Sequence, residues 1–100
     1  MPSLSAIAQS GMQAAQAQLQ ASAHNVANLA TPGFRRQGVE QRAVPEGGGV
    51  TADVVRSEVE GSALEADVVA QLQAKNAFLA NLAVFKAADR MAGALLDERA

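Results

Sequence analysis

The first 34 residues contain no Asp, Glu, Lys or Arg, and this uncharged run constrains the fold more than any other feature of the chain. Ala, Gln and Ser dominate it. It breaks at Thr31-Pro32-Gly33, and the first charged side chains, Arg35 and Arg36, follow at once. A solvated helix normally carries charges on its outer face, whereas amides and small side chains can be buried without stranding a charge. We therefore expect protein to surround this segment on several sides; a merely neutral surface helix is the alternative.

Residues 3–30 are predicted to form one helix, because two rows of residues repeat every seven positions, as in a coiled-coil seam. Ser3 or Ser5 can cap its start. Pro32 disfavours helical geometry at the residue before it, and Gly33 permits a positive φ, so the helix should end just before them. One row is bulky and the other mostly small: Met12, Leu19 and Val26, against Ala8, Ala15, Ser22 and Leu29.

Residues 34–60 change character and are predicted to form a β-hairpin. The segments 39–44 and 50–59 are rich in β-prone valine, and Pro45-Glu46-Gly47-Gly48-Gly49 between them has turn composition. No Gly-Lys-Ser/Thr follows the glycines, so they are read as a flexible tip and not as a phosphate-binding loop. Because the alternation of apolar and polar residues is imperfect, a solvated linker is the alternative for the whole region.

Residues 62–98 are predicted to form a second long helix. Ser62 and Glu65 have the spacing of a capping box, and Glu65 and Asp67 lie where the helix dipole favours anions. An apolar stripe at helical spacing continues to the end of the segment. The chain is therefore read as a single domain, residues 1–100, that is mainly α with a small β-hairpin. Its two long terminal helices are expected to pair as an antiparallel or an intermolecular coiled coil.

The composition indicates that this domain has a thin core. Alanine accounts for 23 of the 100 residues and only three residues are aromatic. Small side chains bury little apolar area each, so the net stability of one copy should be small and association is the usual remedy. We expect a homo-oligomer that assembles through the seams of its helices. The predicted assembly residues are Met12, Ala15, Leu19, Ser22, Val26, Leu72, Phe78, Leu79, Leu82, Phe85 and Leu95.

Several classes of function lack the residues they need. The net charge of −2 does not suit a nucleic-acid binder, and Arg35-Arg36 is read as solvated or as part of an inter-subunit salt bridge. With one histidine, His24, and no cysteine, the chain has no material for a metal site or a nucleophilic triad. We expect no enzyme, cofactor or small-molecule substrate. No apolar run is long enough to span a membrane, and the N-terminus does not read as a cleaved signal peptide.

The stretch SAHNVANLATPGFRRQ, which follows MQAAQAQLQA, closely resembles the N-terminal signature of flagellar basal-body rod, hook and hook-associated proteins. These proteins typically have a small-residue helix that runs into His-Asn-(Ile/Val)-Ala-Asn and then Thr-Pro-Gly-aromatic. The matching positions are Ser22, His24, Asn25, Val26, Ala27, Asn28, Thr31, Pro32, Gly33 and Phe34. The second helix is similar to the family's C-terminal helix at Gln73, Ala77, Phe78, Ala80, Asn81, Ala88, Asp89, Met91, Leu95 and Leu96.

The resemblance implies a structural subunit of the bacterial flagellar rod, located in the periplasmic part of the basal body. Its partners would be itself and other axial proteins, and export would use the flagellar type III apparatus without cleavage of the chain. The short middle region is nearest to minimal proximal-rod members. Gly61-Ser62-Ala63-Leu64 stands where the family's C-terminal segment usually opens with Asn-Val. A helical adaptor or chaperone of a flagellar secretion system is the alternative function.

The motif itself also has a local reading from its chemistry. His24, Asn25 and Asn28 can hydrogen-bond the backbone groups that are left open where the helix ends. Asn28 can in addition adopt the left-handed conformation that asparagine tolerates. We therefore interpret the motif as a helix stop. Glutamate at Ala15 should block assembly if this position faces another copy, and should prevent folding as well if it faces the chain's own second helix.

Overall fold

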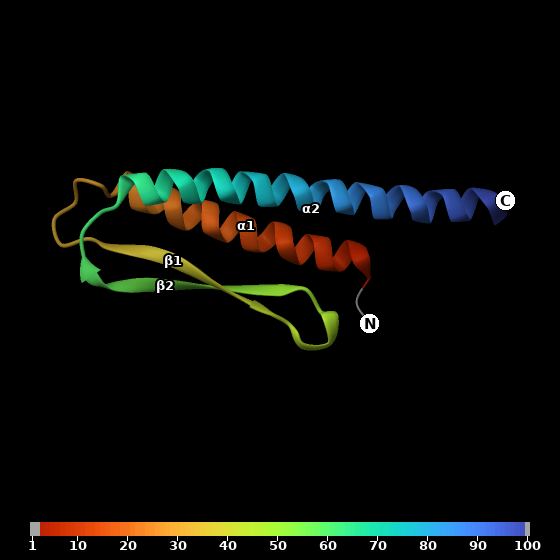
Figure 1. Cartoon of the computed structure of the whole chain (residues 1–100), viewed down its shortest axis with the longest axis horizontal. Coiled ribbons are helices and arrows are strands. Elements are labelled where there is room, and N and C mark those ends of the chain that lie inside the picture. Colours follow the sequence, from red (N-terminus) through yellow and green to blue (C-terminus); the bar gives the residue numbers. More distant parts are fainter. Residues whose placement is uncertain (1–2, 100) are drawn as a thin grey trace.

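The computed structural model describes residues 3–99, and for residues 96–99 the backbone alone. The order of elements is α1 (Leu4–Ala27), β1 (Arg35–Ala43), a 3-10 turn (Pro45–Gly47), β2 (Val50–Glu60) and α2 (Leu64–Arg99). The two helices lie side by side and run in opposite directions, and the hairpin lies along α1 (Figure 1). The mainly helical fold with one small hairpin is the architecture that the sequence predicts.

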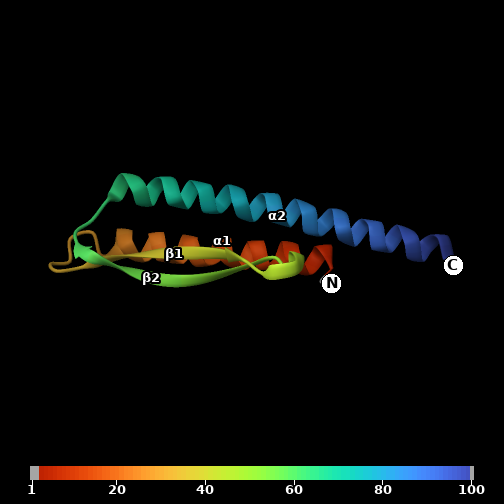
Figure 2. The same cartoon turned by 60° about the horizontal axis from the view of Figure 1, so that its bottom comes forward.

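Helix α1 is the central element of the molecule. It contacts α2 along one side and both strands of the hairpin along another, so the hairpin and α2 lie on different sides of it (Figures 1 and 2). Its buried residues are all small or uncharged: Ala8, Ala14, Ala15, Ala21, Ser22 and Asn25. The absence of charges in the first 34 residues therefore has a cause within one copy, because α1 is covered from two directions by its own chain.

Both ends of α1 are set by side chains. Ser3 is the N-cap, and its hydroxyl accepts a hydrogen bond from the backbone N–H of Ala6 at 3.1 Å. The helix ends at Ala27 and not at residue 30, because Asn28 takes the C-cap position and a turn follows directly. The predicted end was too late because propensity continues through Leu29 and Ala30, whereas the cap depends on the asparagine side chain.

The hairpin prediction is confirmed and the linker alternative is wrong. β1 and β2 are antiparallel, with Val39 opposite Val54 and Ala43 opposite Val50. The glycine-rich tip is not a free loop, since Gly49 has φ +89° and lies against α1, where an added Cβ would come within 3.5 Å of the Ile7 Cα. The Ser10 hydroxyl accepts a hydrogen bond from the N–H of Val50 at 3.1 Å. This contact holds the tip end of the hairpin on the first half of α1.

Helix α2 begins at Leu64, one residue later than a capping box at Ser62 requires. Ala63 therefore precedes the helix, and its carbonyl accepts the N–H of Asp67 at 3.0 Å. Within residues 3–99 no hydrogen bond joins Ser62 to Glu65, so the predicted capping box is wrong. Asp67 does lie in the first turn of α2, as predicted, but its side chain is buried and has specific partners.

Among residues 3–95, whose side chains the structure describes, no large apolar side chain is fully buried. The buried hydrophobic residues of the core are Ala8, Ala14, Ala15, Ala21 and Ala74. The molecule measures 63 × 24 × 14 Å with a radius of gyration of 17.3 Å, whereas a compact domain of this length has about 13 Å. Its accessible surface is 7007 Å², against about 5,400 Å² for a compact monomer of the same mass. The thin core predicted from the composition is present.

Candidate functional site

The motif at residues 24–34 stops α1 through the Asn28 side chain. Asn28 Nδ2 donates to the carbonyl of His24 at 2.9 Å, and Thr31 Oγ1 donates to Asn28 Oδ1 at 3.1 Å. The helix-stop interpretation therefore describes Asn28 and Thr31 well. The left-handed conformation suggested for Asn28 is wrong, since its φ is −104°; the positive φ falls on Gly33, at 71°. Pro32 lies between them in the turn and is exposed.

The end of the motif folds back on α1 through a pair of rings. The His24 and Phe34 rings have centroids 5.4 Å apart and an interplanar angle of 58°. The carbonyl of Phe34 also accepts the N–H of Gly61 at 3.1 Å, which ties the start of β1 to the end of β2. In the described part of the chain the His24 side chain makes no hydrogen bond, so its predicted role in binding open backbone groups is replaced by this ring contact.

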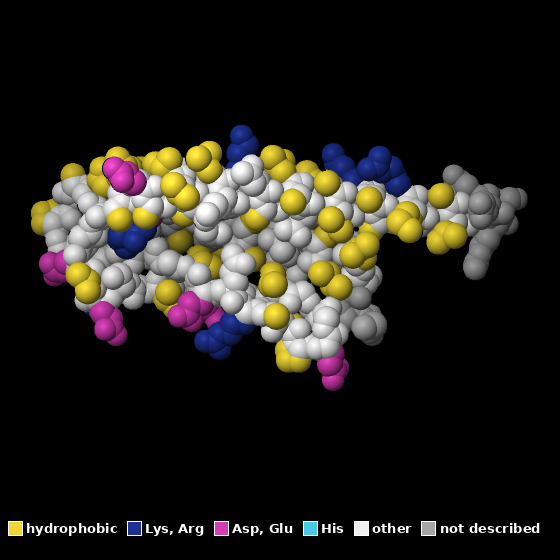
Figure 3. Space-filling view, in the orientation of Figure 1, with side chains coloured by type: hydrophobic (Ala, Val, Ile, Leu, Met, Phe, Trp, Pro, Cys, Tyr) yellow, Lys and Arg dark blue, Asp and Glu magenta, His cyan; other side chains and the backbone are white. Residues whose placement is uncertain are grey.

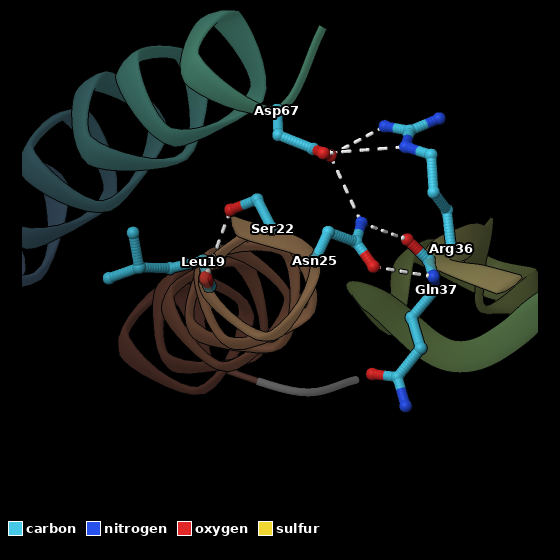
Figure 4. Close-up of polar contacts among 6 residues, drawn as sticks. All are labelled: Leu19, Ser22, Asn25, Arg36, Gln37 and Asp67. Carbon is cyan, nitrogen blue, oxygen red and sulfur yellow. Dashed lines mark hydrogen bonds and ion pairs between the residues drawn. The ribbon is translucent and has the colours of Figure 1, made fainter. Parts of the chain in front are cut away.

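Asn25 joins α1 to β1. Its side chain is 2% exposed and pairs with the backbone of Gln37 in both directions (Figure 4). Asn25 Nδ2 donates to the Gln37 carbonyl at 2.8 Å, and the Gln37 N–H donates to Asn25 Oδ1 at 2.7 Å. The Asn25 amide thus pairs with the backbone of β1 in the same way as the backbone of a neighbouring strand would. The sequence had suggested that Asn25 binds the open backbone groups at the end of its own helix. This prediction is wrong, because its side chain binds Gln37 of β1.

The same amide also joins α1 to α2. Asn25 Nδ2 donates to Asp67 Oδ1 at 3.0 Å, and Asp67 is 1% exposed. Arg36, on β1, reaches the other side of this carboxylate, with Nε 3.3 Å from Oδ2 and Nη2 bonded to Oδ1. We call these four residues, Asn25, Arg36, Gln37 and Asp67, the polar junction. It connects three elements at the end of the molecule where the chain turns from α1 into β1.

The electrostatics of the junction favour a charged Asp67. Burial by itself raises the pKa of Asp67, but the hydrogen bonds from Arg36 and Asn25 and the positive charge of Arg36 outweigh it, so that the pKa lies below its ordinary value. Every buried side-chain polar atom among residues 3–95 has a hydrogen-bond partner. Arg36 therefore makes its salt bridge within one chain. The sequence had suggested either solvation or an inter-subunit salt bridge for Arg36, and neither is needed to explain it.

The predicted assembly residues fall into three groups by exposure. Ala15 and Ser22 are buried, because the small row of α1 faces inward. Five residues are half-buried: Met12, Val26, Phe78, Leu82 and Phe85. Four are exposed: Leu19, Leu72, Leu79 and Leu95. The small row allows α1 and α2 to approach closely, and the bulkier side chains are placed at the flanks of the helix pair.

The flank of the helix pair carries an apolar depression, which we call the lateral groove. It has a volume of about 230 Å³, and Lys75 is the one charged residue that lines it. Hydrophobic side chains also gather along α2 on the face shown in Figure 3. The groove is lined by Ala15, Gln16 and Leu19 of α1 and by Ala74, Lys75, Phe78 and Leu79 of α2. It can accept an apolar side chain of another molecule.

The described part of the chain contains neither a metal-binding cluster nor a membrane-spanning helix. No group of three or more His, Asp or Glu side chains there could hold a metal ion. No helix within residues 3–99 is long and apolar enough to cross a membrane.

Residues 6–35 match the family model described as flagella basal body rod protein. This match covers 30 of the 100 residues and supports the resemblance to flagellar rod proteins. The matched segment runs from the first turn of α1 to the start of β1 and contains the whole motif, including Asn25 and Phe34. The family consists of structural flagellar rod proteins and is not an enzyme family. A comparison with curated proteins found no match.

The rod-family segment supplies one side of the polar junction, and the rest of the chain supplies the other. Asn25 lies inside the matched residues, whereas Arg36, Gln37 and Asp67 lie outside them. The likeness of residues 68–96 to the family's C-terminal helix lies beyond the match and stays a prediction. Sequence reasoning missed Asp67 as a site residue; an acidic residue in the first turn of a helix, within an apolar stripe, was the available signal.

Proposed function

We propose that the chain is a structural subunit of the bacterial flagellar basal-body rod that assembles with itself and with other rod proteins through its terminal helices. The observation that carries this proposal is the mismatch between core and surface. The fully buried apolar side chains are all alanines, while large ones such as Leu19, Leu72, Leu79 and Leu95 are exposed. A rod subunit would cover these side chains with its neighbours.

The fold also supports export without loss of the N-terminal segment. Helix α1 contacts α2 and both strands, and it contributes most of the buried residues. Removing it would leave a hairpin without support and a single long helix, neither of which is stable alone in water. We therefore propose that the chain leaves the cytoplasm intact and functions in the periplasmic rod. With its middle region reduced to one hairpin, it would be a minimal, proximal-rod-like subunit without enzymatic activity.

Isolated basal bodies from the native organism test this function. We expect mass spectrometry to find the chain in them with residues 3–30 present, and deletion of its gene to abolish motility. An adaptor or chaperone, the alternative function, would instead be absent from basal bodies and would form a small complex of fixed stoichiometry with one client protein. Recovery of the chain only in such a complex would overturn the proposal.

A further inference from the structure

Within residues 3–99, no other helix or strand lies alongside the last part of α2. Gly11 lies against Asn81, and Asn25 lies against Asp67. The residue numbers of each facing pair add up to 92, which gives the alignment of the two antiparallel helices. Leu4, the first residue of α1, therefore lies opposite Ala88. Residues 89–99, which we call the overhang, project past the end of α1 (Figures 1 and 2).

The overhang carries exposed apolar side chains that continue the inner face of α2. Met91 is 65% exposed and Leu95 is 62% exposed. Ala88, Ala92 and Leu95 follow Phe85 at helical spacing, on the side that faces α1 earlier in the helix. An inner face that continues beyond its partner helix indicates a surface that another molecule covers.

The lateral groove is a matching surface that the same copy cannot reach. It lies near the middle of the helix pair, and α2 is one continuous helix, so its overhang points away from the groove. The groove and the first residue of the overhang carry opposite charges. Lys75 lines the groove and Asp89 is the first residue of the overhang, and neither forms an ion pair with another side chain of residues 3–95. Arg90, the neighbour of Asp89, turns back along the helix, with its Nε 3.4 Å from the carbonyl of Lys86.

We propose that the overhang of one copy occupies the lateral groove of a second copy, in a head-to-tail contact with Asp89 close to Lys75. This inference rests on the proposed function and names the surfaces that would join neighbouring subunits. Because two different surfaces meet, each copy keeps one of them free, and the contact repeats along an open assembly.

The surface area of the chain agrees with two such contacts per copy. Its 7007 Å² exceeds that of a compact monomer of the same mass by roughly 1,600 Å². A standard stable interface buries about 800 Å² on each partner. One copy therefore carries enough surplus surface for a neighbour at the groove and a second neighbour at the overhang.

Cysteine cross-linking tests the contact directly, because the chain contains no natural cysteine. Leu79→Cys and Leu95→Cys are purified separately, mixed and treated with a short bismaleimide. We expect covalent dimers in the mixture, at about five-fold or greater yield than in either variant alone, because residue 79 meets residue 95 only between copies. A mixture of Gln13→Cys with Leu95→Cys is the matched control, since Gln13 is exposed on α1 and does not line the groove.

A charge exchange gives a second readout. Lys75→Glu alone and Asp89→Lys alone should each lower the 79–95 cross-linking yield about two- to five-fold, and the two together should restore it. Circular dichroism and sedimentation of every variant show whether it is folded and whether it associates.

The outcomes separate this inference from the proposed function. Association without 79–95 cross-links, or equal cross-linking in the single variants, overturns the overhang–groove contact and leaves a self-assembling subunit intact. A chain that stays monomeric at every concentration overturns both. A restored yield in the double charge variant, together with a low yield in the Gln13→Cys control, supports the contact.

Discussion

Asn25 on α1 donates a hydrogen bond to Asp67 on α2, 42 positions away in the chain, and both side chains are almost completely buried. The same amide exchanges two hydrogen bonds with the backbone of Gln37 on β1. A single side chain thus fixes the position of a strand and of a second helix relative to α1. Because the surrounding core is made of alanine, this polar contact defines the packing of the elements more than apolar packing does.

Asn25→Ala should destabilise the monomer by about 3 kcal/mol, because it leaves the partly buried N–H and carbonyl of Gln37 and the buried carboxylate of Asp67 without this partner. Urea denaturation followed by circular dichroism measures the change. Asn28→Ala is the matched control: its hydrogen bonds lie at an exposed helix end, and its loss should cost about 1 kcal/mol or less. Equal losses for the two variants would show that the junction contributes nothing specific.

The stability of the wild-type chain should fall as the pH drops below the usual range of carboxyl groups, and Asp67 should cause part of this fall. Since the pKa of Asp67 is lowered in the folded state, its contribution is complete above the unfolded pKa and is lost as the pH falls through the folded pKa. The groups that face it are Arg36 on β1 and Asn25 on α1.

Asp67→Asn isolates this contribution. At pH 7 the variant should be less stable than the wild type by about 2 kcal/mol, because Arg36 loses its charged partner. As the pH falls from 5 to 2.5, the difference in urea midpoint between the wild type and Asp67→Asn should become smaller. A difference that stays constant over this range would mean that ionisation of Asp67 does not contribute to folding.

Gly11 on α1 lies directly against the side chain of Asn81 on α2. A Cβ at Gly11 would lie 2.7 Å from Asn81 Nδ2, so Gly11→Ala should fail to give the gain of about 1 kcal/mol that helix propensity predicts. The same substitution in an Asn81→Ala background should give that gain, because the obstructing amide is gone. Gly93→Ala is the control in open space. Thermal denaturation of Gly11→Ala, Asn81→Ala, the double variant and Gly93→Ala measures these changes in stability. If the stability changes of Gly11→Ala and Asn81→Ala simply add in the double variant, the two residues are not in close contact.

Charges placed on the two rows of α1 should have different effects. Ala15 is buried against α2, so Ala15→Glu should unfold the monomer, at a cost of several kcal/mol. Leu19 is exposed, so Leu19→Glu should leave the circular dichroism spectrum unchanged and weaken association. Gln13→Glu, at an exposed polar position, should do neither. A Leu19→Glu variant that associates like the wild type would remove Leu19 from the assembly surface.

The two helices, the hairpin and a helix stop shortly before Pro32-Gly33 could be predicted, although not the exact end at Ala27, because each depends on residues close together in the chain. The polar junction could not, since the spacing of Asn25 and Asp67 contains no sign that they meet. The sequence also could not show which row of α1 faces inward. Two alanine-rich helices pack most closely through their smallest residues, so Ala15 and Ser22 face α2 and Leu19 remains outside. The seven-residue repeat identified both rows but did not show which of them faces α2.

Sedimentation velocity of the wild-type chain over a thousand-fold dilution series tests most directly whether its exposed apolar surface drives assembly. We predict that the weight-average sedimentation coefficient rises steadily with concentration, without a plateau at the dimer, because a head-to-tail contact leaves a free surface on every assembly. The helical signal in circular dichroism should stay constant or increase over the same series. A sedimentation coefficient that stays at the monomer value at every concentration, with an unchanged cooperative unfolding transition, would contradict the account.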